Sequence, residues 1–216
     1  IPVPTKQQEN REENMSIKQM KWHAGVLAVT VFAALTVLFA LATVTSNAAT
    51  SYDPETRTYT MTGGTYDQKI VLERNTTTTI VVSGENKLTF DTGVSYAECI
   101  TGEGNLIIKG NGTLATSENT IHCNDLTIID GATLKIDKNV YTYGKVTVEN
   151  AGIESDNGYM SCAGSFLGES RPVHIFNNAQ LRFTGKVSTS GYINAGLILF
   201  GGAVLTDCNA TFENAR

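Results

Sequence analysis

A short pattern of apolar and polar positions recurs through residues 80–205. In each copy two aliphatic residues flank one other residue, and Gly, Asp or Asn stands two positions after the second aliphatic residue. The six copies cover residues 80–84, 106–110, 126–130, 146–150, 173–177 and 197–201. In five of them Leu returns four positions later, at Leu88, Leu114, Leu134, Leu181 and Leu205. The fourth copy instead offers Ile153 one residue early.

This pattern predicts a coil built from two strands joined by a sharp corner. Aliphatic residues at alternate positions point to one face of a strand, and Gly, Asp and Asn tolerate the left-handed backbone that a tight corner requires. The Leu after the corner then begins a second strand that faces the same core. The second aliphatic position recurs every 20 to 27 residues, which is the period of a solenoid and too short for a propeller blade.

The sequence therefore predicts an all-β domain, a right-handed parallel β-helix of about six coils. Helical periodicity is absent after residue 50, so a parallel sheet with helical crossovers is disfavoured. An immunoglobulin-like sandwich stays open as an alternative, although it does not predict a coil-length repeat with a fixed corner.

The N-terminal segment has a different composition. Residues 24–44 contain no charged side chain, Lys18 and Lys21 precede them, and Ser46, Asn47 and Ala48 follow with small side chains. This is the order of a secretory signal peptide, and the apolar run is also close to the ~20 residues that span a bilayer. We expect residues 15–48 to be a cleaved signal peptide or a retained anchor helix with residues 24–44 in the membrane. Both interpretations place the rest of the chain outside the cytoplasm, in the cell envelope or the extracellular space.

Three further boundaries follow from the pattern. Residues 1–14 precede Met15, where a signal peptide should begin, so we expect them to be untranslated leader or disordered sequence. Residues 49–66 lack the corner pattern and are expected to form a cap or linker. Residues 67–216 are expected to form the β-helix, which would be truncated at its C-terminal end because the chain stops within another apparent coil.

Charge and acidic residues narrow the classes of function. The chain has 21 Asp and Glu against 16 Lys and Arg, a net charge of -5, and no basic cluster, which disfavours a nucleic-acid partner. The acidic residues are scattered, so the paired carboxylates of a polysaccharide lyase or glycosidase do not stand out, and we expect no catalytic residue. Asp130 is interpreted as a corner residue. Calcium bound by aligned corners at Asp130, Asn150 and Asn177 is an alternative to a plain ladder of corner residues.

The four cysteines leave two interpretations open. Cys99 and Cys123 are about one coil apart, so they are within reach of a disulfide on adjacent rungs, and an exported protein meets oxidising conditions. They could equally form a buried ladder of free thiols, since free Cys packs like a small apolar residue. No CxxC motif is present, and only His122 and His174 follow the signal segment, which disfavours a zinc site.

Aromatic residues are the candidate binding groups. Tyr141, Tyr143 and Tyr192 are expected in loops between coils, together with Tyr96 and Tyr159. Phe176 and Phe200 share the fourth position of the repeat, which should point outward, one rung apart. Exposed rings of this kind can stack on the C–H faces of sugars. The alternative is that a loop or partner covers them.

Segments such as 104–114 (GNLIIKGNGTL) and 125–134 (DLTIIDGATL) resemble repeats of secreted Gram-positive surface proteins. That family is similar to the pectate-lyase-like superfamily and includes carbohydrate-binding members. The resemblance covers roughly residues 67–216 and implies the coil rather than a ligand. The family's calcium sites cannot be placed on particular residues here.

These observations favour an exported, non-enzymatic surface scaffold that binds a polysaccharide or host glycan or acts as an adhesin. Two alternatives remain: part of a polysaccharide lyase or glycosidase, and a structural spacer for a further C-terminal domain.

Overall fold

The computed structural model describes residues 50–90, 93, 97–117, 119–156, 158–162, 172–184 and 196–213. The chain divides into two compact units, Ile1–Thr45 and Ser46–Arg216, and everything described lies in the second. The expected leader at residues 1–14 and the expected signal or anchor at residues 15–48 fall outside the described residues. Within the described part no helix is long and apolar enough to cross a membrane.

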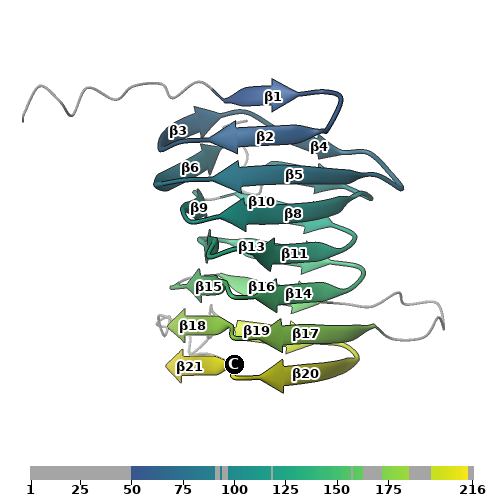
Figure 1. Ribbon diagram of the computed structural model, residues 1–216, viewed down its shortest axis with the longest axis vertical. Coiled ribbons are helices and arrows are strands. Elements are labelled where there is room, and N and C mark those ends of the chain that lie inside the picture. The colour runs from purple at the N-terminus through teal and green to yellow at the C-terminus, as the bar shows by residue number, and fades with distance from the viewer. Residues whose placement is uncertain are drawn as a thin grey trace, which may run out of the picture. The chain divides into compact units, whose positions relative to one another are not determined.

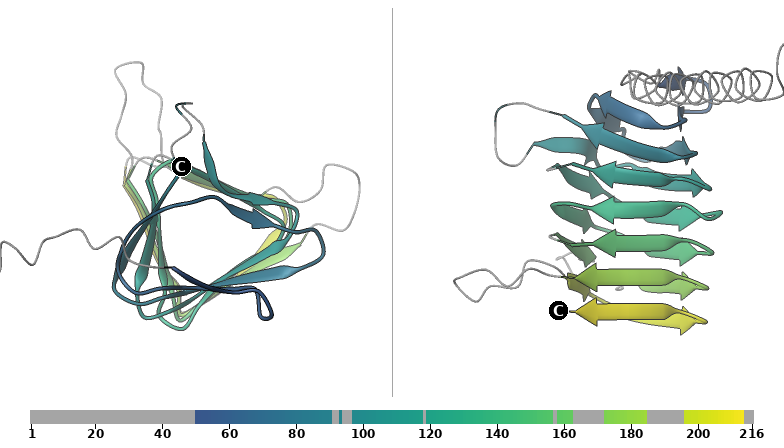
Figure 2. Two further views of the ribbon diagram at one scale, coloured as in Figure 1. Left: turned by 90° about the horizontal axis from the view of Figure 1, so that it is seen from above. Right: turned by 90° about the vertical axis from the view of Figure 1, so that its left-hand side faces the viewer.

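The described chain is all-β and winds through three sheets in turn (Figures 1 and 2). Sheet A consists of β1 (Ser51–Asp53), β2 (Thr58–Met61), β5 (Thr77–Val82), β8 (Asn105–Gly110), β11 (Leu126–Ile129), β14 (Val146–Glu149), β17 (Val173–Asn177) and β20 (Gly202–Thr206). Sheet B consists of β3 (Gly64–Asp67), β6 (Glu85–Thr89), β9 (Thr113–Thr116), β12 (Thr133–Ile136), β15 (Gly152–Ser155), β18 (Gln180–Thr184) and β21 (Asn209–Glu213). Sheet C consists of β4 (Ile70–Leu72), β7 (Glu98–Gly102), β10 (Thr120–Cys123), β13 (Asn139–Thr142), β16 (Tyr159–Cys162) and β19 (Gly196–Leu199).

Every strand pair except β1 with β2 is parallel, and from β2 to β18 each strand pairs with the one three further along the chain. This is a three-sided parallel β-helix, as the view along its axis shows (Figure 2). The prediction of a parallel β-helix is confirmed. About six coils were expected, whereas sheet A contains seven successive parallel strands, from β2 to β20.

The core consists of aliphatic columns that run from coil to coil. In sheet A, Ile108 lies opposite Ile128, which in turn lies opposite Val148, and none of the three is exposed. In sheet B, Leu134 lies opposite both Leu114 and Ile153. The early position of Ile153 in the sequence therefore does not change its register. Burial of each such side chain contributes roughly 1.5–3 kcal/mol, and one coil cannot bury both of its surfaces without neighbours.

Five of the six predicted corners have the expected left-handed backbone. The φ angles are 65° at Gly84, 117° at Gly110, 61° at Asp130, 50° at Asn150 and 132° at Gly201. Gly110 is required for a second reason, because a Cβ atom there would lie 2.2 Å from the carbonyl oxygen of Val82 in the preceding coil.

The fifth copy of the repeat is shifted by one residue. Its left-handed corner is Asn178, with φ 46°, and not Asn177. As a result Phe176 pairs with Val148 in the inward column, and His174 and Phe176 are buried while Val173 is exposed. The prediction that Phe176 points outward is wrong, because one residue of register exchanges the two faces of a strand.

The sixth copy belongs to a different sheet. Leu197 and Leu199 lie in β19 of sheet C, opposite Met160 and Cys162. The strand of sheet A in that coil is β20, and Leu205 lies within it opposite Phe176. Alternating aliphatic residues followed by Gly occur at the ends of strands in more than one sheet. The pattern alone therefore does not show to which sheet a strand belongs. The sequence pattern predicts two strands for each coil, so the third strand of each coil, in sheet C, was not predicted.

The range expected to be a cap also differs from the structure. Only β1 pairs antiparallel, along the edge of β2. Strands β2 and β3 pair in parallel with β5 and β6 and form part of the first coil. Their sequence is rich in Thr and Tyr, and fewer of the inward positions are aliphatic. The repeat of paired aliphatic residues was therefore not recognised in these two strands.

Candidate functional site

The outer face of sheet C carries the largest group of aromatic side chains on described strands. On β13, Val140 and Thr142 are buried. Asn139, which precedes Val140, and Tyr141, which lies between the two buried residues, therefore project outward. The same alternation places His122 outward on β10 and Tyr159 and Ser161 outward on β16. The register aligns His122 with Tyr141 and Tyr141 with Ser161, while Tyr159 lies opposite Asn139.

Tyr143, which directly follows β13, joins these three rings in one group. We call this group the aromatic cluster: His122, Tyr141, Tyr143 and Tyr159. The His122 ring lies 4.7 Å from Tyr141 and 6.5 Å from Tyr143 between centroids, both edge to face. Tyr141 and Tyr159 are 5.7 Å apart at 88°, and their hydroxyl groups are hydrogen-bonded. Asn139 Nδ2 donates to the Tyr141 hydroxyl at 3.3 Å. These contacts hold Tyr141 and Tyr159 half-buried, while Tyr143 is 51% exposed.

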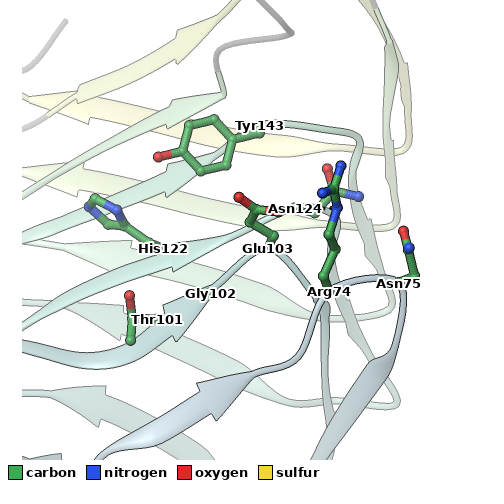
Figure 3. Close-up of a pocket in the computed structure, with 8 residues that line it drawn as sticks. All are labelled: Arg74, Asn75, Thr101, Gly102, Glu103, His122, Asn124 and Tyr143. Atoms are coloured by element: carbon green, nitrogen blue, oxygen red, sulfur yellow. Dashed lines mark ion pairs between the residues drawn. The ribbon is translucent and has the colours of Figure 1, made fainter.

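A polar groove borders the aromatic cluster (Figure 3). It has a volume of ≈ 720 Å³ and is open to solvent. Its lining residues are Arg74, Asn75, Thr101, Gly102, Glu103, His122, Asn124 and Tyr143. Figure 3 shows Thr101 and His122 projecting to the same side from neighbouring strands, with Arg74, Glu103 and Asn124 gathered where the strands end. The groove therefore combines ring surfaces with hydrogen-bonding groups, as ligand sites commonly do.

Charged groups in and beside the groove are paired. Arg74 Nε lies 3.2 Å from Glu103 Oε2, and both side chains are largely exposed. His122 Nδ1 lies 3.6 Å from Glu98 Oε1, and Thr101 Oγ1 donates to Glu98 Oε2 at 2.6 Å. The Glu98 carboxylate is thus held by two partners from β7 and β10.

Gly102 determines the floor of the groove at the end of β7. Its φ is +144°, and a Cβ atom there would lie 2.0 Å from the carbonyl oxygen of Leu72. Only Gly lets β7 approach β4 this closely. A side chain at position 102 would push the backbone of Thr101 and Glu103 away from its present place.

The sequence-predicted binding residues have different outcomes. Tyr141 and Tyr143 are brought together, although Tyr141 lies on a strand and not in a loop. Phe176 is 1% exposed in the core and cannot offer a ring surface. Phe200 is 46% exposed but follows β19 of sheet C, so it is not stacked one rung from Phe176. Tyr192 lies outside the described residues.

His122 is a site residue that the sequence interpretation missed. The segments 121–123 and 140–142 both place an outward ring between two buried residues. This alternation, 19 residues apart, was a usable signal once a third strand per coil was assumed.

Of the two interpretations of Cys99 and Cys123, the structure has the second: both are buried free thiols, and no disulfide joins them. The register pairs Ile121 with Ile100 and shifts just before it, so Cys123 lies beyond Cys99 and not opposite it. Burial raises the pKa of the Cys99 and Cys162 thiols to about 12 and also raises the pKa of Cys123. Such thiols are protonated at neutral pH and unreactive.

Corner residues of neighbouring coils hydrogen-bond to each other where their side chains meet, as expected for a ladder of corner residues. Asn178 Nδ2 donates to Asn150 Oδ1 at 2.9 Å, which occupies an oxygen that the calcium alternative would need. Among the described residues no group of three His, Cys, Asp or Glu side chains is placed to hold a metal ion.

Comparisons with known proteins add no family assignment. No protein-family model, curated protein or solved structure was found to match this chain.

Proposed function

We propose that this protein is an exported cell-surface β-helix that binds carbohydrate without chemical turnover, through the aromatic cluster. The observation that carries the proposal is the convergence of Tyr141, Tyr143 and His122 on one outer sheet face beside a polar groove. Its surface location rests on the signal or anchor expected at residues 15–48.

The chemistry of the cluster suits a sugar. A tyrosine ring offers an apolar face to sugar C–H groups and a hydroxyl at its edge. The neighbouring Glu98, Glu103 and Asn124 side chains supply acceptors and donors for sugar hydroxyls. Because Tyr141 is held by Asn139 and Tyr159, its ring is ordered before a ligand arrives, which lowers the entropic cost of binding.

The first test is glycan-array binding by the full chain, followed by calorimetry on any bound glycan. We expect Tyr141→Ala and Tyr143→Ala each to weaken binding about tenfold or more, equivalent to roughly 1.4 kcal/mol. Tyr52→Ala is the matched control, since Tyr52 is 48% exposed on β1, outside the site. Failure to bind any glycan would contradict the proposal and favour a structural spacer.

A reducing-sugar assay separates binding from hydrolysis. Glu103 lines the groove, and Glu98 contacts the groove residues His122 and Thr101. A glycosidase would need two such carboxylates. We expect no reducing ends to be released from a bound polysaccharide. Release that Glu98→Gln or Glu103→Gln abolishes would make the protein an enzyme.

A further inference from the structure

The aromatic cluster extends along the solenoid axis. Thr101 on β7, His122 on β10, Tyr141 on β13 and Ser161 on β16 occupy successive strands of sheet C. The direct register runs from His122 to Tyr141 to Ser161, and Thr101 lies opposite Val71 of β4 in the same sheet. Neighbouring strands are about 4.7–4.9 Å apart. The side chains therefore form a strip with one position for each strand.

Ring contacts follow the same direction. His122 contacts Tyr141 of the next strand, and Tyr141 contacts Tyr159 of the strand after that. Each contact joins neighbouring coils and not residues of one strand. The strip is therefore continuous over β10, β13 and β16, and the polar groove prolongs it toward β7 and β4.

The charges along the strip are balanced. Among the described residues that line the groove, Arg74 is the one guanidinium or ammonium group, and Glu103 lies 3.2 Å from it. His122 faces the Glu98 carboxylate. An anionic ligand such as a uronate chain would have to displace these carboxylates from their partners. A ligand without charge makes no such demand.

We infer that the ligand is an uncharged, linear β-1,4-linked polysaccharide that lies along the solenoid axis across β7, β10, β13 and β16. This inference rests on the proposed function and specifies the ligand of that same site. A pyranose ring in an extended chain is about as long as the spacing between strands, so one sugar unit meets each strand. The rings stack on Tyr141 and Tyr143, and the groove residues hydrogen-bond the hydroxyls at one end of the chain.

A length series tests the axial placement. Cello-, xylo-, manno- and chito-oligosaccharides of increasing length, up to six units, would be titrated into the full chain by calorimetry. For whichever series binds, we expect affinity to rise up to about four units, one for each strand, and then to level off. Oligogalacturonides of the same lengths should bind at least about tenfold more weakly than that series.

Variants locate the chain on the strip. Tyr143→Ala should weaken short and long oligosaccharides alike, whereas Tyr159→Ala should weaken the tetramer by about fivefold or more and leave the dimer nearly unchanged. Tyr159→Phe keeps the ring and removes only the hydroxyl bonded to Tyr141, so it should restore most of the tetramer affinity. Circular dichroism and the melting temperature verify that each variant is folded.

The outcomes separate this inference from the proposed function. If no glycan of any kind binds, both fail. If a glycan binds but affinity does not depend on length, or oligogalacturonides bind as well as neutral chains, carbohydrate binding stands and the axial, uncharged ligand is overturned. Equal effects of Tyr159→Ala on dimer and tetramer would likewise overturn the axial placement.

Discussion

The outer faces of sheets A and C are built on the same backbone and carry different side chains. In sheet A one outward column runs through Thr79, Ile107, Thr127, Thr147 and Ile175. These are β-branched residues, which suit a half-buried strand surface. In sheet C the corresponding positions hold Thr, His, Tyr and Ser. The inward columns keep the coil in register on both sides, so the outward positions are free to differ, and an unusual outward column is informative about function.

The largest loss of stability is expected from a substitution in the buried, inward-facing column of sheet A. Ile128→Asp places an unpaired carboxylate between Ile108 and Val148, and we expect it to cost more than about 4 kcal/mol and to unfold the middle coils. Thr127→Asp, on the outward face one residue earlier, should cost about 0.5 kcal/mol. Urea denaturation measures both. Equal losses would contradict the division between inward and outward columns.

Next in size is the pair of phenylalanines that the sequence pattern treated as equivalent. Phe176→Ala removes a buried ring and should cost about 3–5 kcal/mol. Phe200→Ala, with a ring 46% exposed, should cost less than about 1 kcal/mol. Thermal denaturation of the two variants decides between the observed register and the expected one, in which both losses would be small.

A third effect depends on pH and arises at His174, also on the inward side of sheet A. Its Nδ1 accepts the amide N–H of Val146 at 3.1 Å, and burial lowers the pKa of the imidazole below its ordinary 6.5. The unfolded chain therefore takes up a proton at a higher pH than the native protein. This contribution to stability is complete above pH 6.5 and is lost as the pH falls through the lower native pKa.

Melting temperatures of the wild type and His174→Gln across pH 4–8 measure this effect. We expect the wild type to lose more stability than the variant as the solution becomes acidic. A constant difference between the two proteins over the whole range would show that His174 does not titrate on unfolding.

A small change in stability is also expected on the outer face of sheet C. Tyr141→Ala should shift the unfolding free energy by less than about 1 kcal/mol, because the ring lies outside the core. Thr127→Ala should have a similarly small effect. Of these two variants, only Tyr141→Ala should reduce glycan binding. A large loss of stability in Tyr141→Ala would mean that the aromatic cluster is structural.

The sequence predicted much of the fold because the coil depends on local rules. The aliphatic pairs and left-handed corners of 80–84, 106–110, 126–130 and 146–150 are visible in single segments. The register of β17 was mistaken because His174 and Phe176 are unusual inward residues, while Val173 and Ile175 imitate the usual ones. Burial in this coil is decided by the position of the corner at Asn178, one residue later than the pattern indicated.

The candidate site was predicted only in part. Tyr141 and Tyr143 were recognised from their residue type, but their contact with His122 depends on the third strand of each coil. Those strands are short, and their inward residues include Cys99, Cys123, Thr142 and Cys162 in place of aliphatics. A thiol or hydroxyl at a buried position carries little hydrophobic signal, so sheet C and its outer face were not evident.

The equal spacing of Ile108, Ile128 and Val148 has a consequence for how such a chain changes during evolution. Twenty residues separate each pair, and each occupies the same place in its coil. An in-frame duplication or deletion of sixty nucleotides there would add or remove one whole rung without turning any residue from the inside to the outside. Genetic length and molecular length then change in the same units, and a surface strip can be extended one step at a time while the rest of the protein keeps its structure.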